Sequence, residues 1–144
     1  MTLIEVMVVV FIIGLTAGLV VMTLPDRATP ERAAAQTLAV TLSQAQDRAI
    51  MSGQPVGLIM SERGYMLAAW TAGRWEPLRG GESVPRSVRL DLTRDTRNPP
   101  PDGWPDLVFD PTGVTDGAAF RLRGKQEQFQ ITLATSGEVQ VEAR

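Results

Sequence analysis

The sequence predicts an α+β protein in which a long N-terminal helix, apolar in its first half and amphipathic in its second, packs on antiparallel β-sheets. Three observations predict this class. Residues 6–24 carry no charge, residues 35–50 repeat apolar side chains at helical spacing, and short apolar runs separated by turn residues follow from residue 56. The expected divisions are a transmembrane N-terminal helix over 1–24, an amphipathic stalk helix over 25–53 and a globular antiparallel β domain over 54–144.

Composition restricts the chemistry that this chain can perform. Its 144 residues are 44% hydrophobic and 21% charged, which is ordinary globular usage and argues against general disorder. The formal net charge of −2 gives no general attraction for nucleic acid. The chain has no Cys and no His, which excludes thiol nucleophiles, histidine acid–base catalysis and the commonest zinc and haem ligands. We therefore expect no cofactor, no metal and no enzymatic activity.

The apolar segment has the length of a membrane span. As a helix, residues 6–24 are about 28 Å long, close to the hydrocarbon core of about 30 Å. A cleaved signal peptide is the alternative, but the apolar stretch is longer than usual, nothing basic precedes it and no small-residue cleavage site follows. Two glycines four residues apart would allow close helix contact. The residues expected to form this membrane helix include Val6, Val10, Phe11, Gly14, Gly18 and Leu24.

Glu5 is an acid inside this apolar sequence. An unpaired carboxylate in hydrocarbon costs about 2–3 kcal/mol or becomes protonated, so a plain membrane anchor gains nothing from it. The nearest basic residue is Arg27, 22 positions away, which is about 33 Å along a helix. A cationic partner for Glu5 must therefore come from outside the chain.

A second helix is bounded by clear signals. Thr29 is a hydroxyl N-cap, Pro30 follows at the first helical position, and Glu31 is an acid at the positive end of the helix dipole. Gly53 is placed to end the helix. One apolar stripe at helical spacing should face a sheet, and it consists of Ala35, Leu38, Ala39, Leu42, Ala45, Ala49 and Ile50.

The rest of the chain reads as short strands in antiparallel sheets, because the connections lack a helical period. Residues 61–64 predict a hairpin turn, and Pro77 predicts an edge strand. Residues 93–105 predict an exposed, proline-rich loop that presents Trp104 as a possible partner contact. The expected strands cover residues 56–60, 65–70, 74–78, 88–92, 107–109, 120–123, 129–133 and 139–141.

Other side chains offer alternatives that we weigh against structural roles. The acids of the second half, Asp91, Asp95, Asp102, Asp106, Asp110 and Asp116, could bind a hard cation, but their spacing fits no calcium loop, and solvated turn residues are the better interpretation. Trp70, Trp75 and Trp104 could stack on a sugar or base, although core or interface packing is favoured. No candidate nucleophile has a recognisable base or elbow motif, so a hydrolase is poorly supported.

The first six residues, Met1 to Val6 (MTLIEV), resemble the start of mature type IV pilins and type II secretion pseudopilins. The resemblance implies a type IV pilin-like fold and a leader removed before Met1 by prepilin peptidase, with N-methylation of Met1. It also supplies a partner for Glu5, namely the free α-amino group of the adjacent subunit, so that the pair fixes the register between subunits.

The second half resembles the H group of minor pseudopilins and their FimT-like pilin relatives. The residues that carry this resemblance are Gly64-Tyr65, Trp70, Trp75 to Leu78, Phe109 to Gly113, Phe120 to Leu122, Ile131 to Leu133 and Ser136 to Val139. It implies a single-pass inner-membrane protein with a periplasmic globular domain that assembles into the type II secretion pseudopilus. The implied partners are other minor and major pseudopilins, the inner-membrane assembly platform and exported substrate proteins.

Two other functions fit the same sequence. A minor pilin of FimT type would serve pilus assembly or DNA uptake, but phosphate binding needs clustered basic residues, and the charges after Gly124 sum to −1. A stand-alone receptor anchored by one span would need no assembly role for Glu5. The sequence thus favours a type II secretion minor pseudopilin with no nucleic-acid partner.

Overall fold

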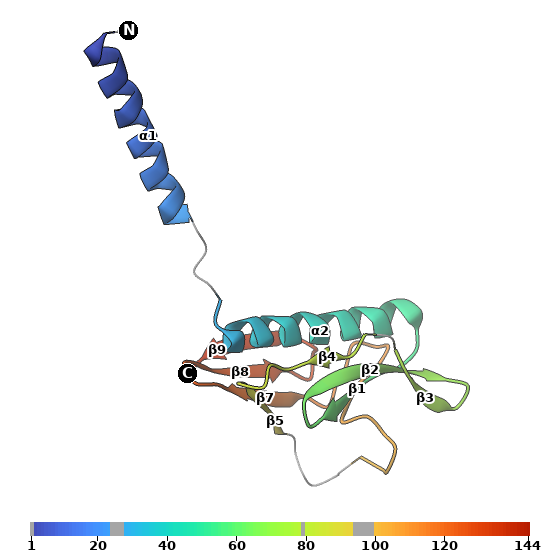
Figure 1. Cartoon of the computed structure of the whole chain (residues 1–144). Helices are drawn as coiled ribbons and strands as arrows, with labels where there is room; N and C mark the ends of the chain where they lie inside the picture. The colour runs from blue at the N-terminus through green and yellow to red at the C-terminus, as the bar shows by residue number, and fades with distance from the viewer. Residues whose placement is uncertain (1, 24–27, 79, 94–99) are drawn as a thin grey trace.

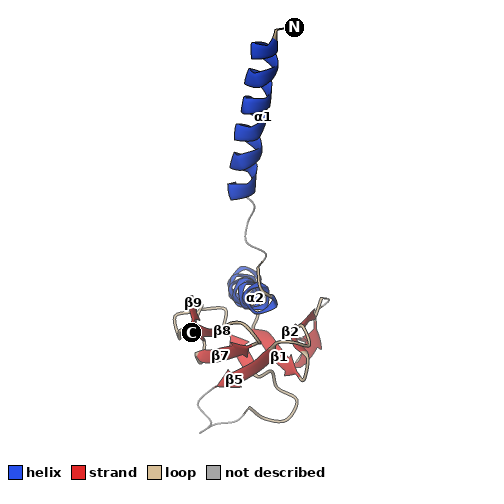
Figure 2. Ribbon diagram, turned by 60° about the vertical axis from the view of Figure 1, so that its left-hand side comes forward, coloured by secondary structure: helices blue, strands red, loops and turns tan. Residues whose placement is uncertain are grey.

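Two helices precede two antiparallel sheets in the computed structural model, which describes residues 2–23, 28–78, 80–93 and 100–144 (Figures 1 and 2). The α+β class is as predicted, but the predicted single long helix is two helices, because the non-helical Thr29 caps the start of the second. The second, amphipathic helix packs on both sheets. The elements are α1 (Leu3–Thr23), α2 (Pro30–Ser52), β1 (Val56–Ser61), β2 (Gly64–Thr71), β3 (Arg74–Pro77), β4 (Glu82–Ser83), β5 (Arg89–Thr93), β6 (Leu107–Phe109), β7 (Ala118–Arg123), β8 (Gln128–Leu133) and β9 (Val139–Ala143).

Helix α1 is formed by the apolar segment. Its first turn is closed by the carbonyl of Thr2, which accepts hydrogen bonds from the backbone N–H groups of Glu5 and Val6. Within the described residues, no helix combines the length and the hydropathy needed to cross a membrane. The predicted transmembrane role therefore stays a prediction. Met1 and Leu24, which belong to the same prediction, lie outside the described residues.

Helix α2 begins and ends where the sequence predicts. The Thr29 hydroxyl accepts a hydrogen bond from the N–H of Arg32 at 3.2 Å, and Pro30 occupies the first turn, where no donor is required. Gly53 adopts a left-handed conformation with φ of 66°, and its N–H donates to the Ala49 carbonyl. The cap residues thus mark both ends of this helix.

One face of α2 is fully buried, and it is narrower than the predicted stripe. Ile50 is 49% exposed and Ala39 is half-buried, so their assignment to the buried face was wrong for Ile50 and only partly right for Ala39. Each lies one residue, or about 100° of helix rotation, beyond a buried neighbour. The buried positions of the stripe are Ala35, Leu38, Leu42, Ala45 and Ala49.

The strands form two antiparallel sheets, as predicted. The first has the order β3-β2-β1-β6, with β4 also paired to β2, and the second has the order β5-β7-β8-β9. Glu62 and Arg63 make the predicted turn between β1 and β2, and Pro77 lies in an edge strand. The two-residue strand β4 was not predicted, because a pair of residues shows no periodicity.

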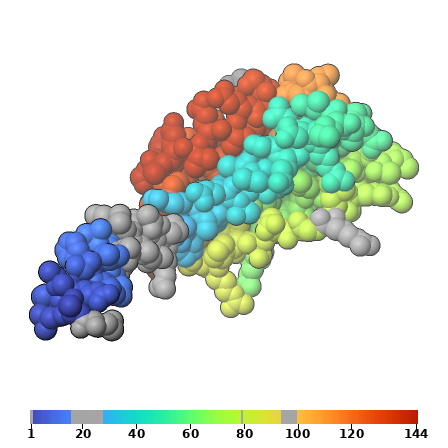
Figure 3. Space-filling model, turned by 90° about the horizontal axis from the view of Figure 1, so that it is seen from above, coloured from blue at the N-terminus to red at the C-terminus, as the bar shows by residue number. Residues whose placement is uncertain are grey.

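The core lies between α2 and the inner faces of both sheets. Leu58 and Phe109 contribute from the first sheet, Phe120 and Ile131 from the second, and Leu38 from the helix, all without exposed surface. Seen from above, α2 lies between the C-terminal strands and the first sheet, with its outer side on the molecular surface (Figure 3). The helix therefore joins two sheets that share no ladder of hydrogen bonds among the described strands.

Candidate functional site

The described side chains of α1 form an uncovered apolar surface. Leu3 is 82% and Phe11 69% exposed, and Val6 and Val10 are also exposed. An added Cβ at Gly14 would meet nothing within 4 Å. Gly18 lies in the same helix. So large an apolar area is favourable only when lipid or other protein covers it.

Glu5 lies in the first turn of this helix and is exposed. A carboxylate at this end interacts favourably with the helix dipole. Among the described residues, Glu5 has no hydrogen-bond or ion-pair partner for its side chain. Its predicted pairing with a neighbouring subunit stays a prediction, because a single chain contains no such neighbour.

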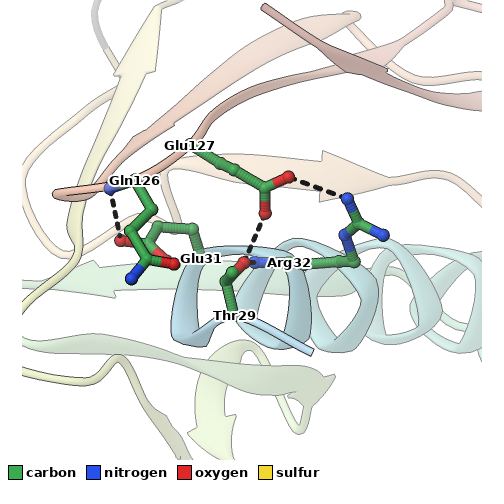
Figure 4. A network of polar contacts seen from close by, with 5 residues as sticks. All are labelled: Thr29, Glu31, Arg32, Gln126 and Glu127. Carbon is green, nitrogen blue, oxygen red and sulfur yellow. Dashed lines mark hydrogen bonds and ion pairs between the residues drawn. The ribbon is translucent and has the colours of Figure 1, made fainter. Parts of the chain in front are cut away.

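A polar network fastens the start of α2 to the turn between β7 and β8, and we call it the clamp: Thr29, Glu31 and Arg32 on the helix, and residues 125–127 on the turn (Figure 4). Glu31 Oε1 accepts hydrogen bonds from the N–H groups of Lys125 at 2.8 Å and Gln126 at 3.4 Å. Arg32 Nη2 donates to Glu127 Oε1 at 2.7 Å, and the Thr29 hydroxyl donates to Glu127 Oε2. The clamp thus holds the helix start against the second sheet.

The pKa values of both carboxyl groups in the clamp are lowered. For Glu31, the largest effect is that of its own backbone N–H, which lowers the pKa of the carboxyl. Burial raises this pKa, and the N–H groups of Gln126 and Lys125 lower it further. The Thr29 hydroxyl, followed by Arg32, lowers the pKa of Glu127. Sequence reasoning gave Glu31 only a dipole role and missed its burial. The sequence held no local signal for this burial, because it depends on the distant Gly124, where any side chain would overlap the Glu31 carboxyl group.

Three tryptophans meet on the first sheet and form what we call the tryptophan cluster. Trp70 and Trp75 are directly paired across β2 and β3, with ring centroids 5.2 Å apart. Trp104 lies 5.7 Å from Trp70 and 5.9 Å from Trp75. These edge-to-face and tilted arrangements are favourable ring geometries. Trp104 is 48% exposed, and the buried Nε1 of Trp75 has no hydrogen-bond partner among the described residues.

The loop that carries Trp104 is held down at its end. The N–H of Asp106 donates to the Leu58 carbonyl, and its carboxylate accepts from the N–H of Met60, both at 2.8 Å. Pro105 is buried against Gly57, so the prediction of an exposed loop over residues 93–105 was wrong at Pro105. The absence of a side chain at Gly57 leaves the space that the proline ring occupies. Residues 94–99 of that loop lie outside the described residues.

Two of the other predicted acids make contacts within their own strand or turn, and Asp102 and Asp116 are exposed. Asp110 accepts hydrogen bonds from the N–H and the hydroxyl of Thr112, and the hydroxyl is the main reason that the pKa of Asp110 is lowered. Asp91 pairs with Arg89 at 3.3 Å. In the part of the chain that the structure describes, no three acids lie close enough to hold a metal ion. Asp95 is outside that part.

The sequence family described as Type II transport protein GspH matches residues 34–137. The chain belongs to this family. The matched region contains most of α2 and all strands up to β8, so the membership rests on the folded domain and not on the apolar segment. No curated protein sequence matches the chain significantly.

Solved structures of two family members share the fold. The minor pseudopilin EpsH from the type 2 secretion system of Vibrio cholerae is 20% identical, with a TM-score of 0.66 over 82% of this chain and 98% of the other. GspH of Escherichia coli is 20% identical, with a TM-score of 0.63 over 83% of this chain and 93% of the other. The family confirms the predicted role as a type II secretion minor pseudopilin of the H group, a structural subunit whose periplasmic globular domain is anchored to the membrane.

Proposed function

We propose that this GspH-family subunit is held in the inner membrane by a single span over residues 1–24 and passes from there into the periplasmic pseudopilus. The uncovered apolar surface of α1, beside a domain with its own complete core, is the observation that supports this proposal. In the membrane, lipid covers Val6, Val10 and Phe11. In the filament, helices of other minor and major pseudopilins replace the lipid, with Gly14 and Gly18 allowing close approach. The subunit acts by assembly and not by catalysis.

Processing and assembly then require partners outside the chain. Prepilin peptidase would release Met1 as an N-methylated terminus, and the inner-membrane assembly platform would move the subunit into the filament. Mass spectrometry of the N-terminal peptide of the protein purified from its own membrane tests the first step. An N-methylated Met1 is expected. An unmodified peptide extending upstream of Met1 would contradict the processing step.

Glu5 sets the register in this proposal. Its carboxylate pairs with the α-amino group of the adjacent subunit, because nothing basic in the first turns of its own helix can neutralise it. In a low-dielectric bundle an unpaired charge costs several kcal/mol, which is enough to favour correct docking over misaligned docking. The acid is therefore retained at a cost to membrane insertion.

The test replaces Glu5 and follows insertion separately from assembly. Glu5→Leu should leave the membrane-fraction abundance at or above wild type, while co-purification with partner pseudopilins and export of a substrate fall about tenfold or more. Glu62→Leu, at an exposed turn of the soluble domain, is the control and should change neither. If Glu5→Leu assembles and supports export as well as wild type, the registration role is refuted.

Trp104 is the residue that we propose as a contact for a partner pseudopilin or an exported protein. Its half-exposed ring extends the tryptophan cluster to the surface, and large aromatic side chains dominate the energetics of protein interfaces. Trp104→Ala should weaken co-purification with that partner while the membrane fraction is unchanged. Unaltered co-purification with every pseudopilin, and unaltered export, would remove Trp104 from the contact surface.

A further inference from the structure

The outer face of the second sheet collects arginines that are far apart in the sequence. Arg89 in β5 lies directly opposite Arg123 in β7, and Arg121 occupies the same face two residues from Arg123. Leu90, Leu122 and Phe120 alternate with them and point into the core. We call Arg89, Arg121 and Arg123 the arginine face.

Two of the three guanidinium groups on this face have no partner among the residues that the structure describes. Arg89 has one ion pair, to Asp91 on its own strand, at 3.3 Å and with its side chain 80% exposed. Arg121 and Arg123 are exposed, and among the described residues neither has an ion pair or a side-chain hydrogen bond. Like charges directly opposite each other on neighbouring strands are destabilising. The pairing of Arg89 with Arg123 thus has an electrostatic cost, which among the described residues only the carboxylate of Asp91 partly offsets.

We propose that the arginine face is a docking surface for a carboxylate-bearing segment of another protein. Planar guanidinium groups bind carboxylates with two parallel hydrogen bonds, which makes arginine the preferred residue for such recognition. Arg121 and Arg123 repeat at about 7 Å, the same repeat as alternate residues of any extended strand. An extended partner with an acid at every second position therefore matches the face in charge and in spacing.

The charges beside the arginines favour a protein over a nucleic acid. Asp91 lies opposite Arg121 on one side, and Gln130 on the other side leads to Glu142 in β9. These two carboxylates would repel a continuous phosphate backbone, whereas a protein partner can place a cation or a neutral residue against each of them. Three arginines would also neutralise only about three phosphates, which gives weak, salt-sensitive binding.

The neighbouring positions leave room for a partner to approach. Ala119 and Thr132 are paired beside Arg121 on the same face, and both side chains are short. Figure 1 shows β5, β7 and β8 side by side, with α2 covering the other side of the sheet. The arginine face is therefore separate from the tryptophan cluster, which lies on the first sheet.

The test uses the full chain in a nonionic detergent and a fluorescent ten-residue peptide of alternating Glu and Thr. Anisotropy should show submillimolar binding that the same peptide with Gln in place of Glu lacks. The double variant Arg121→Gln/Arg123→Gln should weaken binding about tenfold or more. The affinity of Arg121→Lys/Arg123→Lys for the peptide should lie between those of the double Gln variant and wild type, because the charge stays and the paired hydrogen bonds are lost.

The control is Arg48→Gln/Arg74→Gln, which removes the same charge from two exposed positions on α2 and β3, away from the arginine face, and should bind as wild type does. An equal loss of binding in the control would show attraction to net charge alone and would overturn the proposal. So would the absence of peptide binding by wild type. Tighter binding of a 20-base-pair DNA duplex than of the peptide would also overturn it, in favour of a nucleic-acid surface.

Discussion

Replacing Gly57 by Ala should destabilise the domain, although alanine is intrinsically better than glycine in a strand. The added Cβ would lie 2.5 Å from Pro105 Cβ and 3.1 Å from Trp75 Cζ3, and nearer still to Pro105 Cγ. The proline ring is rigid, and the two hydrogen bonds of Asp106 hold it down. Overpacking costs about 1–3 kcal/mol, against about 0.5–1 kcal/mol gained by removing a glycine from a strand. We expect a net loss of about 1–2 kcal/mol.

Thermal unfolding of the full chain in nonionic detergent measures this loss. A domain of this size changes its Tm by about 4 °C per kcal/mol, so the variant should unfold about 4–8 °C below wild type. Its tryptophan emission should also shift, because Trp104 moves with Pro105. Gly81→Ala is the control, since its Cβ would meet nothing nearer than Met66 Cβ at 3.5 Å. A Gly57→Ala protein that unfolds at or above the wild-type Tm with unchanged emission would refute the packing argument.

Two further predictions concern α2. Because the clamp lowers the pKa of Glu31 from an ordinary value of 4.5, the stability that this ionised group contributes is present above that value and is lost as pH falls through the folded-state pKa. Urea unfolding at pH 7 and pH 3 should therefore show that acid lowers the free energy of unfolding more for wild type than for Glu31→Gln. Equal losses in the two proteins would contradict the stabilising role of the ionised Glu31. Leu38 is fully buried, so Leu38→Ala should lower the free energy of unfolding in urea by about 2–5 kcal/mol. Val40 is 54% exposed, and the control Val40→Ala should change it by less than about 0.5 kcal/mol. Similar losses in both variants would show that α2 is placed wrongly on the sheets.

The elements that sequence analysis located correctly are those with local signals. The cap residues Thr29 and Gly53 mark the ends of α2 because each acts on backbone groups within a few residues. The longer strands show as apolar runs between turn residues. The family resemblance was equally accessible, since its motifs are short and contiguous. Local chemistry was therefore enough for the fold class.

Features that depend on distant residues were not accessible in this way. Glu31 meets a turn that begins 93 positions later at Gly124, and nothing beside Glu31 in the sequence reveals its burial. The tryptophan cluster and the arginine face arise from strand register, which places Trp70 opposite Trp75 and Arg89 opposite Arg123. A register shift of one residue would reverse every one of these faces. Pairing of strands, and not periodicity within them, decides which side chains meet.

The clamp also has a mechanical consequence. If α1 is held in a filament, a pull along the chain enters the domain at Thr29, the residue that donates to Glu127. The force reaches the bonds of Glu31 and Arg32 to the second sheet before it reaches the apolar core. The force is then shared by α2 and the second sheet, because residues 125–127 of that sheet's turn are bonded to the first turn of α2. The first sheet follows the far end of α2 in the chain, beginning at Val56, and is therefore sheltered from tension until the clamp opens.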